Sequence, residues 1–147
     1  MEPEQRKKLE TLLAGEHIAL LVTQGDEWPT ATMQAYAETP DLDLVFIMQE
    51  EADRFQNLRK RPHVAVFIDD RVRGDAATFR ISRVSIQGIA AEVAPGGQEW
   101  DQLKSLFLAK NPFEARFFKL ASLRMVRFKP RRVSYAGADY STFKTQF

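Results

Sequence analysis

The chain has 147 residues, of which 44% are hydrophobic, and this is enough apolar material for one continuous core. Its 21 basic and 20 acidic residues leave a formal charge of +1, which argues against a general attraction to nucleic acid or anionic membranes. The chain has no cysteine and only two histidines, so it forms no disulfide, has no thiolate nucleophile and offers few metal ligands. We therefore expect one domain over residues 1–147 that binds no metal.

The chain begins with a charged, amphipathic segment, MEPEQRKKLETLL, which lacks the apolar run of a signal peptide. No later stretch approaches the roughly 18 apolar residues that a membrane-spanning helix needs. These features predict a cytoplasmic protein that does not enter membranes.

The first third of the chain predicts one helix and three strands. Leu9, Leu12 and Leu13 have helical spacing after Pro3 and before Gly15, which is a typical residue at a helix end. Branched and aromatic residues, separated by turns rich in Gly, Pro and Asp, then follow in three runs. The expected strands are residues 17–23, 30–36 and 42–48, and we expect them to form an antiparallel meander.

The rest of the chain predicts an amphipathic helix over residues 50–60, further strands and two covering helices. Residues 79–93 are expected to form one long, bent strand, and its inward parity changes near Ser82 and Arg83, which predicts a β-bulge there. Helical spacing joins Trp100, Leu103 and Phe107, and a second helix is expected after Pro112. The remaining expected strands are residues 64–68, 123–129 and 132–135. About seven strands with few long helices indicate a mainly β barrel with short capping helices.

One segment resembles the core of the pyridoxamine 5′-phosphate oxidase-like family of FMN-binding split β-barrels. Its pattern is a hairpin and third strand, a short helix with Arg54 three residues before Asn57-Leu58, and then Pro62-His63-Val64 opening a strand. The segment reads WPTATMQAYAETPDLDLVFIMQEEADRFQNLRKRPHVAVFI. Weaker similarities cover residues 83–88 and 128–133. The resemblance implies a split barrel of six to seven antiparallel strands.

The resemblance also implies a cofactor and the residues that hold it. Family members hold FMN, or in some branches a deazaflavin or haem, in a cleft between the two subunits of a homodimer. Arg54 matches the basic position that binds the FMN phosphate, and Arg83 falls where the family places a polar group near the flavin. The strand wall for the ring maps to Thr32, Met33, Gln34, Ile47 and Met48.

The sequence departs from the family pattern at several positions. Met48-Gln49 and Ala52 replace hydroxyl residues of the phosphate shell, and Asp53 stands where the oxidase has a second arginine. The C-terminal Arg-x-His of true pyridoxamine phosphate oxidases is absent. The histidine of the haem-utilising branch is Arg54 here, and no histidine follows His63, which argues against haem.

Two function hypotheses therefore remain open. The first is an FMN-dependent oxidoreductase of unknown substrate, and the second is a non-catalytic flavin-binding or stress-related protein with a weakened cofactor site. Simpler interpretations apply to single residues: Arg54 paired with Glu50 or Glu51, and Arg83 as an exposed edge residue. We read the basic clusters at residues 59–61 and 129–132 as solvated surfaces rather than as a nucleic-acid site. The 11 phenylalanines favour a hydrophobic homodimer interface.

Overall fold

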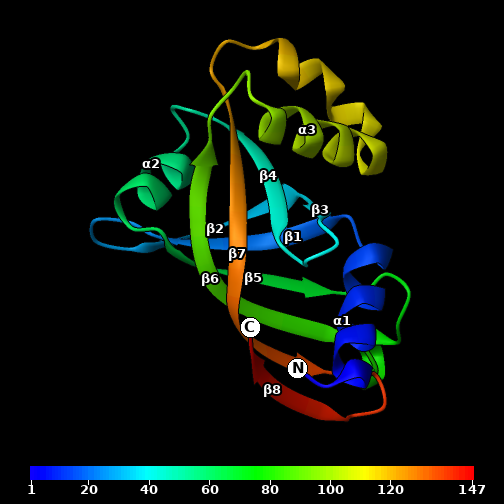
Figure 1. Cartoon of the computed structure of the whole chain (residues 1–147). Helices are drawn as coiled ribbons and strands as arrows, with labels where there is room; N and C mark the ends of the chain where they lie inside the picture. Colours follow the sequence, from blue (N-terminus) through cyan, green and yellow to red (C-terminus); the bar gives the residue numbers. More distant parts are fainter.

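The computed structural model describes all of residues 1–147 and has a curled antiparallel sheet with helices at its ends and on one face (Figure 1). The helices are α1 (Pro3–Gly15), α2 (Asp53–Lys60), α3 (Gln98–Lys110) and the 3₁₀-helices η1 (Ala76–Thr78) and η2 (Pro112–Lys119). The strands are β1 (Ile18–Gln24), β2 (Pro29–Ala35), β3 (Ala37–Glu38), β4 (Leu44–Gln49), β5 (His63–Asp69), β6 (Arg83–Val93), β7 (Leu123–Ala136) and β8 (Thr142–Gln146).

The sheet runs in the order β2-β1-β5-β6-β7-β4-β3, and β8 adds to β7. The segment from Pro29 to Glu38 pairs first with β1 and then, after Tyr36, with β4. This segment closes one end of the barrel, while β2 and β4 diverge without pairing at the other end. The mainly β split barrel predicted from the sequence is confirmed, with this divergence as its split.

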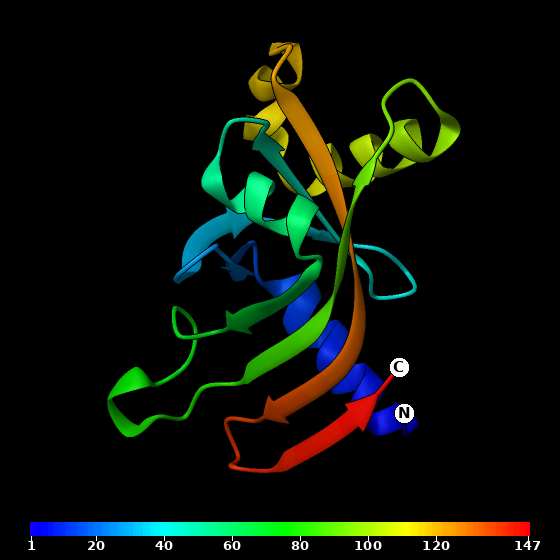
Figure 2. The same ribbon diagram turned by 90° about the vertical axis from the view of Figure 1, so that its left-hand side faces the viewer.

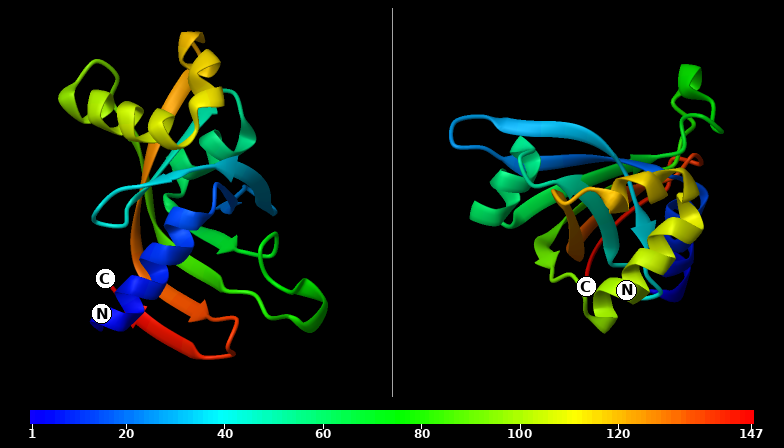
Figure 3. Two further views of the ribbon diagram at one scale, coloured as in Figure 1. Left: turned by 90° about the vertical axis from the view of Figure 1, so that its right-hand side faces the viewer. Right: turned by 90° about the horizontal axis from the view of Figure 1, so that it is seen from above.

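The barrel interior is filled by the apolar face of α1, which lies across the sheet (Figures 2 and 3). Leu9 and Leu13 are fully buried there. Strand β4 is apolar on both faces because Phe46 and Met48 point into this core, whereas Val45 and Ile47 belong to a second core under α3. Both cores therefore meet at β4, which borders the split.

Buried polar contacts fix α3 against the barrel. The Tyr36 hydroxyl donates to the Leu13 carbonyl at 2.6 Å, and the Asn111 amide donates to the Tyr36 carbonyl at 2.9 Å. Lys110 donates to the same Leu13 carbonyl at 2.7 Å and pairs with Glu38 at 2.5 Å. Since η2 begins immediately after Asn111, these contacts also fix η2 beside the split.

Several predictions about connectivity were wrong. The expected meander is present only in part: β1 and β2 pair along their whole length, but β4 pairs with the second run only at Ala37–Glu38 and otherwise with β7. The strand begins at Arg83 rather than Phe79, and its register shift lies between Gln87 and Gly88 instead of at Ser82-Arg83. The last two predicted strands are one strand, β7, and the bulge accommodates its Pro130. The helix expected after Pro112 is the 3₁₀-helix η2, and β8 was not predicted.

Candidate cofactor site

A cleft of about 200 Å³ lies at the split of the barrel. Three consecutive residues of β2 form one side of the cleft, three of β4 form the other, and α2, η2 and the start of β7 complete it. The lining residues are Met33, Gln34, Ala35, Ile47, Met48, Gln49, Arg54, Glu114, Phe117 and Leu123. The fold thus brings together five of the seven predicted site residues, from segments far apart in the sequence.

Arg54 belongs to the short helix α2 (Figure 1) and lines the cleft. Phe55 and Leu58 are buried in the main core and hold one face of the helix. On another face, the Asn57 amide donates to the hydroxyls of Thr23 at 3.1 Å and Thr30 at 3.4 Å. These contacts fix the rotation of α2, and they give the Asn-Leu pair of the sequence motif a structural role.

Arg54 is half-buried and has no carboxylate partner. Its Nε is buried and makes no hydrogen bond, and burial lowers the pKa of the guanidinium. The interpretation of Arg54 as an ion-paired surface residue is wrong, because the Glu50 carboxylate contacts Arg124 at 2.8 Å and Arg59 at 3.8 Å instead. A buried donor without a partner is costly to a fold, and such a group is a candidate for ligand binding.

Thr32 supplies a second unpartnered polar atom on β2. Its Oγ1 is buried and has no hydrogen-bond partner. Thr32 alternates with Met33, so it shares the inward face of the strand with Thr30 and Gln34. Because Thr30 contacts α2 through Asn57, this face of β2 is the one that faces the helix carrying Arg54.

Most of the remaining lining of the cleft is apolar. Ile47 and Met48 are buried in β4, whereas Met33 is 69% exposed at the edge of the cleft. Phe117 and Leu123 extend this surface from η2 and β7. The cleft therefore combines apolar side chains with one free cation, which is the chemistry that a planar ring with an anionic group requires.

Glu114 and Phe117 are cleft residues that the sequence analysis missed. Glu114 forms no ion pair, and burial raises the pKa of its carboxyl while the neighbouring Arg116 opposes this effect. A helix was expected after Pro112, but nothing local in the sequence associates Glu114 with Arg54. An acid in the cleft weakens the binding of an anion there.

Arg83 does not belong to this cleft. It lies at the start of β6 opposite Asp69 and Ala136, and its guanidinium covers the Phe79 ring at 4.5 Å. Its Nη1 donates to the Ile81 carbonyl at 3.3 Å. Within one chain, the predicted cofactor residues thus fall into a group around Arg54 and an isolated Arg83.

The curled sheet and its split define a split β-barrel protein. A model of the pyridoxamine 5′-phosphate oxidase family matches residues 5–137, so the chain belongs to this family. A comparison with curated protein sequences found no match. No helix is long and apolar enough to cross a membrane.

Several solved structures share the fold at low sequence identity. A heme-binding protein from Mycobacterium smegmatis has a TM-score of 0.86 at 18% identity, over 99% of this chain and 59% of that one. The heme storage protein HutZ from Vibrio cholerae has a TM-score of 0.64 at 15% identity, over 88% and 89%. An FAD-binding protein from Mesorhizobium loti has a TM-score of 0.71 at 15% identity, over 96% and 94%. The fold is therefore shared by haem-binding and flavin-binding proteins and does not by itself select between the two groups.

Proposed function

We propose that this protein binds FMN in the cleft at the split and acts as an FMN-dependent oxidoreductase. The observation that carries the proposal is Arg54, a half-buried guanidinium without a partner beside an apolar wall. A phosphate accepts charge-assisted hydrogen bonds from such a group and satisfies its free donors.

The residues of the cleft divide the binding task. Arg54 would hold the phosphate. Thr32, whose free hydroxyl lies on the strand face toward α2, would add a hydrogen bond to it. Met33, Ile47 and Met48 would contact the isoalloxazine ring. Bound FMN supplies hydride or single-electron transfer, while the chain binds the ring, orients it and excludes water from one side.

A homodimer would complete this site. The cleft of about 200 Å³ is smaller than the roughly 300 Å³ at which ligand pockets begin, so a second wall is required. Met33 also borders an exposed apolar surface on the outer face of β1, where Ile18 is 53% and Leu20 is 37% exposed. A second copy packed on this surface would cover the cleft, and Arg83 would reach the flavin only from that copy.

A non-catalytic flavin-binding protein is the second candidate. Two observations favour it. Arg54 is the only cation in the cleft, whereas the family pattern has several donors for the phosphate, and Glu114 places an acid in the same cleft. Both features weaken the binding of a dianionic phosphate. Anaerobic reduction of the bound flavin by NADH or NADPH distinguishes an enzyme from a carrier.

The direct test is reconstitution of the purified protein with FMN, followed by gel filtration and an absorbance spectrum. We expect flavin bands to elute with the protein at about one FMN per chain. A protein that elutes colourless after incubation with excess FMN contradicts the proposal. A parallel sample of the protein is incubated with haemin. If that sample retains haem while the first sample releases FMN, the cofactor is haem and not FMN.

The dimer is tested separately with Leu20→Glu. A carboxylate in the exposed apolar surface of β1 opposes burial against a second copy. We expect light scattering to give two chains for the natural sequence and one chain for Leu20→Glu, together with loss of FMN retention. Glu10→Gln, on the exposed face of α1, is the matched control. A single-chain mass for the natural protein at micromolar concentration contradicts the dimer.

A further inference from the structure

One carboxylate of the cofactor cleft has no partner within the chain. Glu114 lines the cleft at the split, is partly buried and forms no ion pair. A bound phosphate does not use this group, because both are negatively charged. A partly buried acid without a cation carries a desolvation cost, so such a group in a cleft is a candidate for ligand binding.

The packing of the 3₁₀-helix η2 explains why Glu114 lines the cleft. On another side of the helix, the centre of the Phe118 ring lies 6.2 Å from that of Trp100 and 6.3 Å from that of Phe107, in edge-to-face contacts. A 3₁₀-helix has three residues per turn, so Glu114 and Phe117 lie one above the other on the same face. Both residues line the cleft. An acid and an aromatic ring therefore form one surface of the cleft.

The arginine next to this surface does not neutralise the acid. Arg116 is exposed, and its guanidinium lies over the Phe117 ring at 4.9 Å instead of bonding the Glu114 carboxylate. Arg54 is the only other charged residue that lines the cleft. It forms no ion pair with Glu114 and makes no contribution to the raised pKa of that acid. The cleft therefore contains a cation and an acid that lie apart and that can bind different chemical groups.

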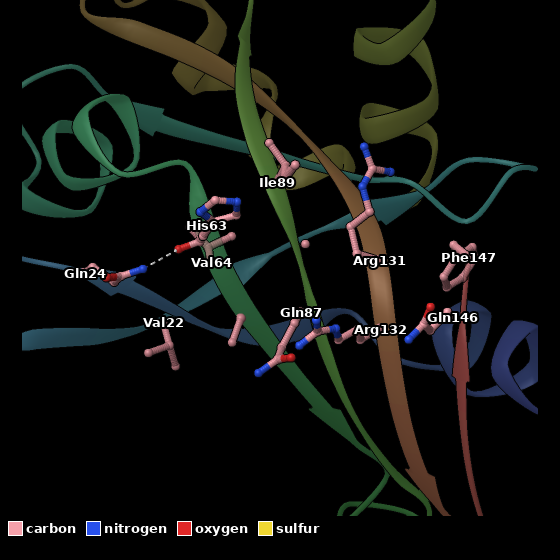
Figure 4. A pocket seen from close by; sticks show the side chains of 12 residues that line it. Val22, Gln24, His63, Val64, Gln87, Ile89, Arg131, Arg132, Gln146 and Phe147 are labelled. Carbon is pink, nitrogen blue, oxygen red and sulfur yellow. Dashed lines mark hydrogen bonds between the residues drawn. The ribbon is translucent and has the colours of Figure 1, made fainter.

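Other hollows of the surface offer no comparable acid. The groove on the outer face of the sheet (Figure 4) is lined by Arg131 and Arg132 but by no carboxylate. This groove also continues the apolar surface that the homodimer would cover. A hollow beside β1 contains Glu16 and Asp69, and each of them bonds an arginine at 2.7 Å. Among these hollows, the cleft is the one whose acid remains free for a ligand.

We propose that Glu114 binds the cationic group of the organic reactant that meets the flavin in this cleft. The reactant is a small organic cation with an apolar body and without a phosphate, because FMN occupies the one phosphate-binding cation, Arg54. Its apolar body packs on Phe117 and Leu123. A second copy that covers the cleft would exclude water from this contact and strengthen it. The inference rests on the proposed FMN site and assigns the class of reactant that this site accepts.

Titration calorimetry of the full chain with three ligands that share one ring tests the charge preference. The ligands are benzylammonium, benzyl alcohol and benzoate. We expect the FMN-loaded protein to bind benzylammonium at one per chain and about tenfold more tightly than benzyl alcohol. Benzoate should bind no more tightly than benzyl alcohol, because Glu114 repels it. Equal affinities for benzylammonium and benzyl alcohol, or a preference for benzoate, overturn the proposal.

Two variants locate the preference. Glu114→Gln should bind benzylammonium and benzyl alcohol with equal affinity, and it should bind FMN at least as tightly as the natural protein. Glu4→Gln is the matched control, because Glu4 is an exposed acid without an ion pair on α1. A preference that survives in Glu114→Gln, or that disappears equally in Glu4→Gln, overturns the proposal. Weaker FMN binding by Glu114→Gln also overturns it, since the acid would then hold the cofactor.

The same titrations of the FMN-free protein separate this inference from the proposed function. Glu114 belongs to the chain itself, so its preference for a cation does not require FMN. A protein that retains no FMN but prefers benzylammonium through Glu114 keeps the cation site and contradicts the FMN site. A protein that retains FMN but shows no preference for benzylammonium overturns the cation site alone.

Discussion

Arg54→Met should affect stability and cofactor affinity in opposite directions. The natural side chain holds a buried Nε without a partner in the FMN-free protein, and an unsatisfied buried donor costs about 1–3 kcal/mol. Arg54 is only half-buried, so we take the lower end, about 1 kcal/mol, as the gain when Met replaces it. For a chain of this size, that gain raises the melting temperature by about 3 °C.

The same substitution should weaken FMN binding. Loss of a charge-assisted contact to phosphate costs about 1.5–3 kcal/mol, which corresponds to roughly a 10- to 150-fold higher Kd. Thermal unfolding of the FMN-free protein and a fluorescence titration with FMN measure the two effects. Arg59→Met is the control, because Arg59 is exposed at the outer side of the same helix. If Arg54→Met lowers the melting temperature and leaves the FMN affinity unchanged, Arg54 is a structural residue and the reasoning fails.

Three further predictions concern charge and packing. Burial raises the pKa of Glu114, so this acid becomes neutral at a higher pH than an exposed glutamate does, and FMN binding should strengthen relative to Glu114→Gln as the pH falls. At pH 7 we expect Glu114→Gln to bind FMN roughly fivefold more tightly, and a ratio of the two Kd values that stays constant with pH contradicts the role of Glu114. Lys110→Met leaves Glu38 partly buried without its partner, which should cost about 3 kcal/mol in urea unfolding, and Lys110→Met/Glu38→Gln should recover part of that loss. A Cβ at Gly88 would lie 2.3 Å from a backbone carbonyl oxygen of β7, so Gly88→Ala should cost about 2 kcal/mol; an unchanged melting temperature would show that the bulge relaxes freely.

Local signals predicted most elements of the fold. Leu9, Leu12 and Leu13 have helical spacing and fill the barrel as the buried face of α1. The apolar run after Asp43 became β4, whose two faces meet two different cores. The position of Arg54 in the cleft followed from the motif around Asn57, whose hydrogen bonds fix the helix.

Pairing between distant strands had no local signal. The three adjacent strand segments were interpreted as a meander because they follow one another in the sequence. The burial of β4 on both faces also requires β7 and α3 as neighbours, and no short pattern in the sequence predicts these two neighbours. The parity change before Val84 reflects the start of β6 at Arg83 rather than a bulge. The register shift near Gly88 depends on how closely two strand backbones approach, which a single strand does not report.

The cofactor residues that lie in one local motif were predicted, whereas those brought in by distant contacts were not. Residues on β2, β4 and α2 were predicted together because one continuous motif contains them. Glu114 and Phe117 were missed because η2 reaches the cleft only through the anchoring of α3 by Lys110 and Asn111. Arg83 lies outside the cleft of its own chain, so its predicted role depends on the second copy.

Riboflavin lacks the phosphate of FMN, so a comparison of the two ligands measures how much Arg54 contributes to phosphate binding. The measurement is the ratio of the Kd values for riboflavin and FMN in the natural protein and in Arg54→Met. We expect FMN to bind at least about tenfold more tightly than riboflavin to the natural protein, and the two ligands to bind Arg54→Met with nearly equal affinity. The same preference for FMN in both proteins would contradict phosphate binding by Arg54.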